Sequence, residues 1–105
     1  MQLKIGFLGA GKMATALARG FVRVELVFPR EIIAADPFDT ARKHFAAETG
    51  AKTTAANLAV AQAANVLILA TKPDQVPAAL AEISDVFTKK PVSYTHLTLP
   101  TKRIV

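Results

Sequence analysis

Apolar and polar positions follow two periods along the chain, and each change of period marks a predicted element. Short apolar runs predict buried strands, with a minimal polar strand between them, at 3–8, 32–35, 52–54 and 66–70. Apolar residues at helical spacing predict helices at 11–24, from 39 or 40 to 48, at 57–64 and at 75–86. Strands and helices therefore alternate four times.

This alternation predicts an α/β fold, with a parallel sheet covered by helices on both faces. The expected strand order is 3-2-1-4, with a ligand crevice between the first and fourth strands, where the order reverses. In the first helix we expect Met13 and Phe21 to lie in the core. Asp39 or Thr40 is expected to cap the second helix, which should end at Gly50.

A G-x-G-x-x-A pattern, formed by Gly9, Gly11 and Ala14, lies between the first strand and the first helix. Gly9 permits the tight turn, Gly11 lets the main chain approach a pyrophosphate, and Ala14 lets the helix pack close to the strand. The pattern predicts a Rossmann-like, doubly wound dinucleotide-binding fold, and its context disfavours a merely structural turn. Lys12 either adds positive charge near the pyrophosphate or is solvated.

Three further positions have a functional and a structural interpretation. Asp36 ends the second strand, where an acid contacts the adenosine ribose and favours NAD over NADP, but Asp before Pro also favours a turn. Arg42 and Lys43 either meet a 2′-phosphate or form a solvated helix face, so the choice of cofactor stays open. Asn57 is expected to contact the ribose, to cap the third helix, or to do both.

The segment Ala70-Thr71-Lys72-Pro73 follows the fourth strand beside the glycine pattern. Its backbone can touch the ribose or phosphates of a cofactor, although Lys72 is also compatible with an ordinary surface lysine. His44 has no cysteine or neighbouring histidine with which to bind a metal, and we expect no metal site. Since no Ser-His-Asp set or marked carboxylate pair occurs, we assign no catalytic residue.

Composition narrows the class of protein. The 105 residues suit one domain, and the absence of cysteine excludes disulfides and fits a reducing compartment, so we expect a cytoplasmic protein. The formal net charge is +5, but its basic residues are scattered among acids, so we expect no nucleic-acid partner. No signal-peptide layout and no bilayer-long apolar run occurs, so we expect no membrane partner.

The tail differs in composition from the rest, because alanine and acidic residues are absent after Lys90. We interpret residues 1–90 as the dinucleotide-binding domain and residues 91–105 as a non-native tail. The run Val92-Ser93-Tyr94-Thr95-His96-Leu97 resembles the translation of a sequencing adapter. The alternative is a native fifth strand at 92–96, with alternating faces.

Residues 1–90 resemble the N-terminal domain of pyrroline-5-carboxylate reductase. The resemblance rests on the runs Ile5-Gly6-Phe7-Leu8-Gly9-Ala10-Gly11-Lys12-Met13-Ala14, Ile32-Ile33-Ala34-Ala35-Asp36-Pro37 and Val66-Leu67-Ile68-Leu69-Ala70-Thr71-Lys72-Pro73, together with Asn57. It implies reduction of 1-pyrroline-5-carboxylate to L-proline with NADPH or NADH. The Lys-Pro pair after the fourth strand makes the match more specific than the glycine pattern alone.

By the same resemblance, a cofactor site is implied at Leu8, Gly9, Ala10, Gly11, Lys12, Met13, Asp36, Asn57, Ala70, Thr71, Lys72 and Pro73. The resemblance also implies a helical C-terminal domain, absent here, that forms a homo-oligomer and most of the site for the small-molecule substrate. The chain alone is therefore expected to bind cofactor without catalysis. Two alternatives are a part of another Rossmann dehydrogenase or imine reductase, similar to the 3-hydroxyacid dehydrogenases, and a non-catalytic nucleotide-binding module.

Overall fold

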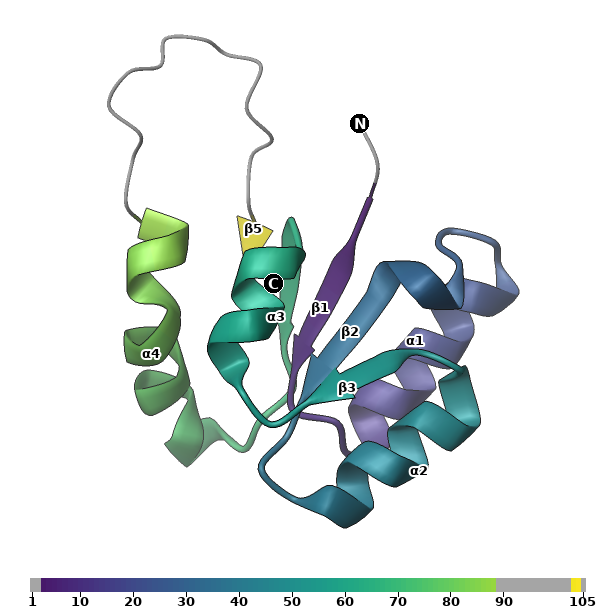
Figure 1. Ribbon diagram of the computed structural model, residues 1–105, viewed down its shortest axis with the longest axis horizontal. Coiled ribbons are helices and arrows are strands. Elements are labelled where there is room, and N and C mark those ends of the chain that lie inside the picture. The colour runs from purple at the N-terminus through teal and green to yellow at the C-terminus, as the bar shows by residue number, and fades with distance from the viewer. Residues whose placement is uncertain (1–2, 89–102, 105) are drawn as a thin grey trace, which may run out of the picture.

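The computed structural model describes residues 3–88 and 103–104, which form a parallel sheet between two layers of helices (Figure 1). The strands are β1 (Ile5–Leu8), β2 (Ile32–Ala35), β3 (Lys52–Thr54), β4 (Val66–Leu69) and β5 (Arg103–Ile104). The helices are α1 (Lys12–Arg23), α2 (Asp39–Thr49), α3 (Asn57–Ala63) and α4 (Val76–Thr88), with short 3₁₀ turns η1 (Pro29–Glu31) and η2 (Pro73–Gln75).

The order of strands across the sheet is β3-β2-β1-β4-β5, and every pair is parallel. Leu8, the last residue of β1, pairs with Ala35 of β2 and Leu69 of β4, so the three central strands end level with one another. The predicted order 3-2-1-4 and the Rossmann-like fold class are confirmed. The order reverses beside β1, which leaves the carboxyl ends of β1 and β4 next to each other.

The period of two along the strands divides the core between the faces of the sheet. Ile5 and Phe7 of β1 join the cluster beneath α1 and α2, whereas Leu8 joins the cluster beneath α3 and α4. Phe7 packs edge-on against Phe45 of α2, with ring centroids 5.8 Å apart. Both faces of the central strands are therefore covered, which explains why their sequences are almost wholly apolar.

The glycine in the middle of β1 has a packing role that the sequence did not reveal. A Cβ atom on Gly6 would lie 2.4 Å from Cγ1 of Val60 and 2.8 Å from Cβ of Ala64. The absence of a side chain at Gly6 therefore lets α3 approach β1 closely.

The predicted boundaries of the elements agree well with the structure, but both predicted side-chain caps are wrong. β2 and β3 have the predicted bounds, and α2 ends at Gly50, whose φ of 76° is left-handed. Phe38 is the N-cap of α2 and Ala56 that of α3, and neither helix has a side-chain cap. Asp39 and Asn57 instead occupy the first helical positions.

The prediction for the buried face of α1 is wrong in part. Its buried residues are the small ones, Ala14, Thr15 and Ala18. Met13 is 60% exposed, which contradicts its predicted place in the core. Phe21 is partly buried and packs against the core beneath α1, with its ring 6.3 Å from that of Phe7, so the prediction for Phe21 is confirmed.

A fifth strand occurs at Arg103–Ile104. It pairs in parallel with Val66 and Leu67 of β4. Residues 92–96 lie outside the described part of the chain. The interpretation of residues 91–105 as a non-native tail stays a prediction.

Candidate functional site

The glycine loop, defined as Gly9, Ala10 and Gly11, joins β1 to α1 where the strand order reverses. Gly9 has a φ of 108°, and a Cβ atom there would lie 2.7 Å from the carbonyl oxygen of Ala70. The Gly9 N–H donates a hydrogen bond of 2.7 Å to the Ala35 carbonyl, and the Ala70 N–H donates one of 2.8 Å to the Leu8 carbonyl. The loop is therefore clamped between the ends of β2 and β4. Position 9 requires glycine, both for its positive φ and for the close packing against Ala70.

The other glycine of the loop opens onto empty space. Gly11 is the N-cap of α1, and no heavy atom lies within 4 Å of the position of a Cβ on it. Lys12 and Met13 follow it and are exposed. The first N–H groups of a helix have no partner within the helix and lie at the positive end of its dipole, so this end can receive an anion.

Asp36 connects the glycine loop to the end of β2. Its Oδ2 accepts a hydrogen bond of 2.9 Å from the Ala10 N–H, and its Oδ1 accepts one of 2.9 Å from the Phe38 N–H. The contact with Phe38, two residues on, confirms the turn that Asp before Pro predicts. The contact of Asp36 with the ribose stays a prediction, and the half-buried carboxylate lies beside the loop that would hold the phosphates.

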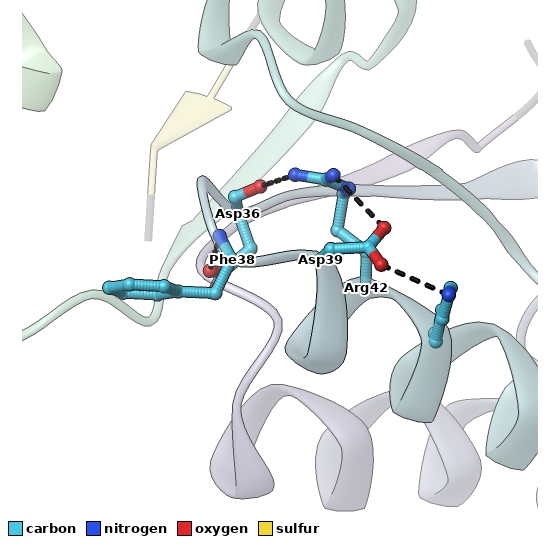
Figure 2. A network of polar contacts seen from close by, with 5 residues as sticks. Asp36, Phe38, Asp39 and Arg42 are labelled. Carbon is cyan, nitrogen blue, oxygen red and sulfur yellow. Dashed lines mark hydrogen bonds and ion pairs between the residues drawn. The ribbon is translucent and has the colours of Figure 1, made fainter.

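Charged side chains of α2 surround the backbone of this turn (Figure 2). Nη1 of Arg42 donates to the Asp36 carbonyl oxygen at 2.6 Å, and Nη2 lies 3.3 Å from Oδ1 of Asp39. Nζ of Lys43 lies 3.1 Å from Oδ2 of Asp39. The hydrogen bond and charge of Lys43, aided by Arg42, lower the pKa of Asp39 below its ordinary value. Arg42 and Lys43 are thus ion-paired with Asp39 on one face of α2, and Lys43 is exposed there.

At the end of β4, the segment 70–73 lies beside the loop through the packing of Ala70 against Gly9. Lys72 is the exposed N-cap of the turn η2, and Pro73 is its first residue. Among the described residues, the one buried side-chain oxygen or nitrogen atom without a hydrogen-bond partner is Oγ1 of Thr71. A buried hydroxyl in that state is costly unless a ligand or water satisfies it.

Asn57 comes to the same edge of the sheet by a different route. It is half-buried and opens α3, three residues after β3 ends at Thr54. The Thr54 carbonyl accepts a hydrogen bond of 3.1 Å from the Asp36 N–H, which ties the end of β3 to the acid. The structure therefore brings the glycine loop, Asp36 and Ala70–Thr71 into contact, and Asn57 begins α3 at the same edge of the sheet.

Sequence reasoning missed three features of this site. The contact between Ala10 and Asp36 joins residues 26 apart, so no local pattern predicts it. The orphaned hydroxyl of Thr71 is also visible only in three dimensions. The Asp39 ion pairs had a signal, because residues three and four apart on a helix share a face.

The geometry suits a ligand with phosphate groups. Open space at Gly11, the free amides that begin α1 and the unsatisfied Oγ1 of Thr71 fit a dinucleotide lying across the ends of β1 and β4. Among residues 3–88 and 103–104, no group of three or more His, Cys, Asp or Glu side chains is placed to hold a metal ion. Within the same residues, no helix is long and apolar enough to cross a membrane.

Comparison with known proteins adds the following findings. The profile of a family described as "NADP oxidoreductase coenzyme F420-dependent" matches residues 4–93. Pyrroline-5-carboxylate reductase 3 of Rattus norvegicus is 42% identical over 85 residues, which are 81% of this chain and 31% of that protein. The chain thus spans about a third of the length of the curated relatives it matches.

Solved structures agree with the relatives found by sequence. A pyrroline-5-carboxylate reductase from Coxiella burnetii superposes with a TM-score of 0.78 at 27% identity, over 86% of this chain and 33% of that one. The Plasmodium falciparum pyrroline carboxylate reductase, solved with NADP bound, gives a TM-score of 0.67 at 23% identity, over 85% of this chain and 31% of that one. The last likeness bears on the fold alone. The resemblance predicted from the sequence is confirmed.

Proposed function

The chain belongs to the NADP oxidoreductase coenzyme F420-dependent family, and on that premise we propose that it is the cofactor-binding part of a pyrroline-5-carboxylate reductase. The longer protein would reduce 1-pyrroline-5-carboxylate to L-proline with NADPH or NADH. Its relatives of that name, which match over 81% of this chain, support the substrate. The observation that best supports binding of a dinucleotide cofactor is the glycine loop, which is clamped where the strand order reverses and is open at Gly11.

We assign the cofactor to the ends of β1, β2 and β4 by the fit of the residues there. The phosphates would lie against Leu8, Gly9, Ala10, Gly11, Lys12 and Met13, the ribose beside Asp36 and Asn57, and the middle of the cofactor along Ala70, Thr71, Lys72 and Pro73. The cofactor, when bound, supplies the hydride that reduces a C=N bond. The chain's own residues bind and orient it: the α1 amides hold negative charge, and Thr71 offers a hydroxyl group.

The chain is proposed to bind the cofactor without catalysing the reaction. The groups at the carboxyl edge of the sheet are suited to binding a cofactor. We assign no described side chain there to the protonation of an imine. The remaining two thirds of the relatives' length would supply the site for the small-molecule substrate and the contacts of a homo-oligomer. A cytoplasmic location, without nucleic-acid or membrane partners, belongs to the same proposal.

Calorimetric titration of the chain with NADH and with NADPH tests the cofactor site. Gly11→Asp would place a carboxylate where the pyrophosphate lies, and we expect it to weaken binding by at least about tenfold. Gly20→Asp is the matched control, because Gly20 is exposed on the same helix with no atom within 4 Å of its Cβ position. Equal binding by wild-type chain and Gly11→Asp would contradict the proposed site.

A reductase assay tests the rest of the proposal. The chain, mixed with 1-pyrroline-5-carboxylate and NADPH, should leave the absorbance of NADPH unchanged, whereas the product of the full-length gene should oxidise NADPH and form proline. Turnover by the chain alone would contradict its proposed inactivity. A full-length product that ignores this imine but reduces another substrate would contradict the proposed reaction while leaving the cofactor site intact.

A further inference from the structure

Four charged side chains lie next to the proposed ribose site, and their arrangement is specific. Asp39 is the first residue of α2, so Arg42 and Lys43 lie three and four residues further along on the same face. Each oxygen of its carboxylate has a different cation, Arg42 at 3.3 Å and Lys43 at 3.1 Å. With Asp36, the four groups sum to no net charge.

Arg42 is the more constrained of the two cations. Only 21% of its side chain is exposed, against 78% for Lys43. Its guanidinium spans from the Asp36 carbonyl to the Asp39 carboxylate, with bonds at both ends. Figure 2 shows the ring of Phe38 directed away from these groups, so the Asp39 side of the turn is the charged one. The cation nearest Asp36 is thus held by oxygen atoms of the protein.

Asp36 is also fixed in place. Both of its carboxylate oxygens accept backbone N–H groups, from Ala10 and Phe38. Moving this carboxylate away from an incoming anion would break both bonds and disturb the glycine loop. A 2′-phosphate carries between one and two negative charges and needs cations that are free to meet it.

We propose that Asp39 is a specificity-determining residue, which makes the chain favour NADH by engaging the two cations that a 2′-phosphate would need. This inference rests on the proposed function and names the cofactor that the proposed site prefers. The fixed negative charge of Asp36 repels a 2′-phosphate. Asp39 pairs with Arg42 and Lys43, so neither cation is free to offset that repulsion. Since exposed ion pairs are weak, the preference is a moderate one, which a single substitution can shift.

Calorimetric titration of the whole chain with NADH and NADPH tests this inference. The wild-type chain should bind NADH about tenfold more tightly than NADPH, a difference that corresponds to about 1.4 kcal/mol. Asp39→Asn keeps the shape of the side chain and removes the negative charge that pairs with both cations, while the bond from Arg42 to the Asp36 carbonyl stays in place. NADPH affinity should therefore rise about tenfold, while NADH affinity changes less than about twofold. The gain should shrink as salt is raised, because exposed charges are screened.

Glu48→Gln is the matched control, since it removes one acid from the exposed face of the same helix, paired with Arg19 at 3.2 Å. It should leave the ratio of the two affinities unchanged. Adding Arg42→Gln and Lys43→Gln to the Asp39→Asn variant should abolish the gain. Equal gains with Glu48→Gln would reduce the effect to overall charge and overturn the inference.

The outcomes separate this inference from the proposed function. If neither cofactor binds the wild-type chain, the proposed function fails and the inference fails with it. If both cofactors bind and Asp39→Asn moves their ratio by less than about twofold, the cofactor site stands and the role of Asp39 is wrong. Wild-type preference for NADPH would also overturn the inference.

Discussion

Replacing Gly9 with alanine should destabilise the fold far more than the same change at Gly11. At Gly9 the φ of 108° is strained for any residue with a side chain, at a cost of about 1–3 kcal/mol. The added Cβ would also lie 2.7 Å and 2.8 Å from the carbonyl oxygen and carbon of Ala70 and 3.0 Å from the Thr71 nitrogen. These are backbone atoms of the end of β4 and its following loop, which cannot rotate away, so overpacking adds about 1–3 kcal/mol.

The total, about 2–6 kcal/mol, is a large part of the 5–15 kcal/mol that folding typically provides. Gly11 has a φ of −81° and open space around it, so Gly11→Ala should change stability by less than about 1 kcal/mol. Urea denaturation followed by circular dichroism suits this chain, which has no tryptophan. Similar shifts of the midpoint for the two variants would refute the account of the clamped loop.

Two other predictions concern the core. Gly6→Ala should lower the free energy of unfolding by about 1–3 kcal/mol, because the added Cβ would overlap Cγ1 of Val60. In a double-mutant cycle measured by urea denaturation, adding Val60→Ala should recover part of that loss. Phe45→Ala removes a fully buried ring that packs on Phe7, so it should lower the free energy of unfolding by about 3–5 kcal/mol. The control is Phe38→Ala, whose side chain is 67% exposed and whose loss should be well under about 1 kcal/mol in the same assay. Equal losses would contradict the described packing.

Much of the fold could be predicted because its signals are local. The bounds of β2 depend on an apolar run that Asp36 and Pro37 close, and those of β3 depend on the short run of Thr53 and Thr54 after Gly50. The end of α2 depends on Gly50. The strand order follows from the glycine loop, since that loop marks the first strand of a doubly wound sheet. These rules need no knowledge of which side chains meet.

The face of α1 could not be predicted by the same means. Large apolar residues at 13, 17 and 24 repeat with helical spacing, yet all three are exposed to between 37% and 71%. The helix packs through Ala14 and Ala18, four residues apart, which join the buried cluster that contains Ile5 and Phe7 of β1. The spacing of apolar residues identifies an apolar stripe on a helix. The distance at which the helix packs decides whether large or small residues are buried.

The caps failed for a related reason. Asp39 and Asn57 are good N-cap residues, but each lies one position inside its helix. The Thr54 hydroxyl oxygen accepts a hydrogen bond of 3.2 Å from the Ala56 N–H. This bond closes the turn before α3, and the hydroxyl does not cap the helix. Local side-chain bonds of this kind compete with capping, and sequence alone does not rank them.

Asp36 is the residue whose role changed most between sequence and structure. From the sequence, an acid at the end of β2 predicts a contact with the ribose, and the Asp36-Pro37 pair predicts a turn. In the structure, Oδ2 of Asp36 also accepts a hydrogen bond from the Ala10 N–H, so the same carboxylate supports the glycine loop. That bond links the proposed ribose site to the glycine loop. Replacing Asp36 to admit NADPH would free the Ala10 amide and loosen the loop, so it changes two properties together. Asp39 has no such bond to the loop, and for that reason its substitution isolates the effect of charge on cofactor choice.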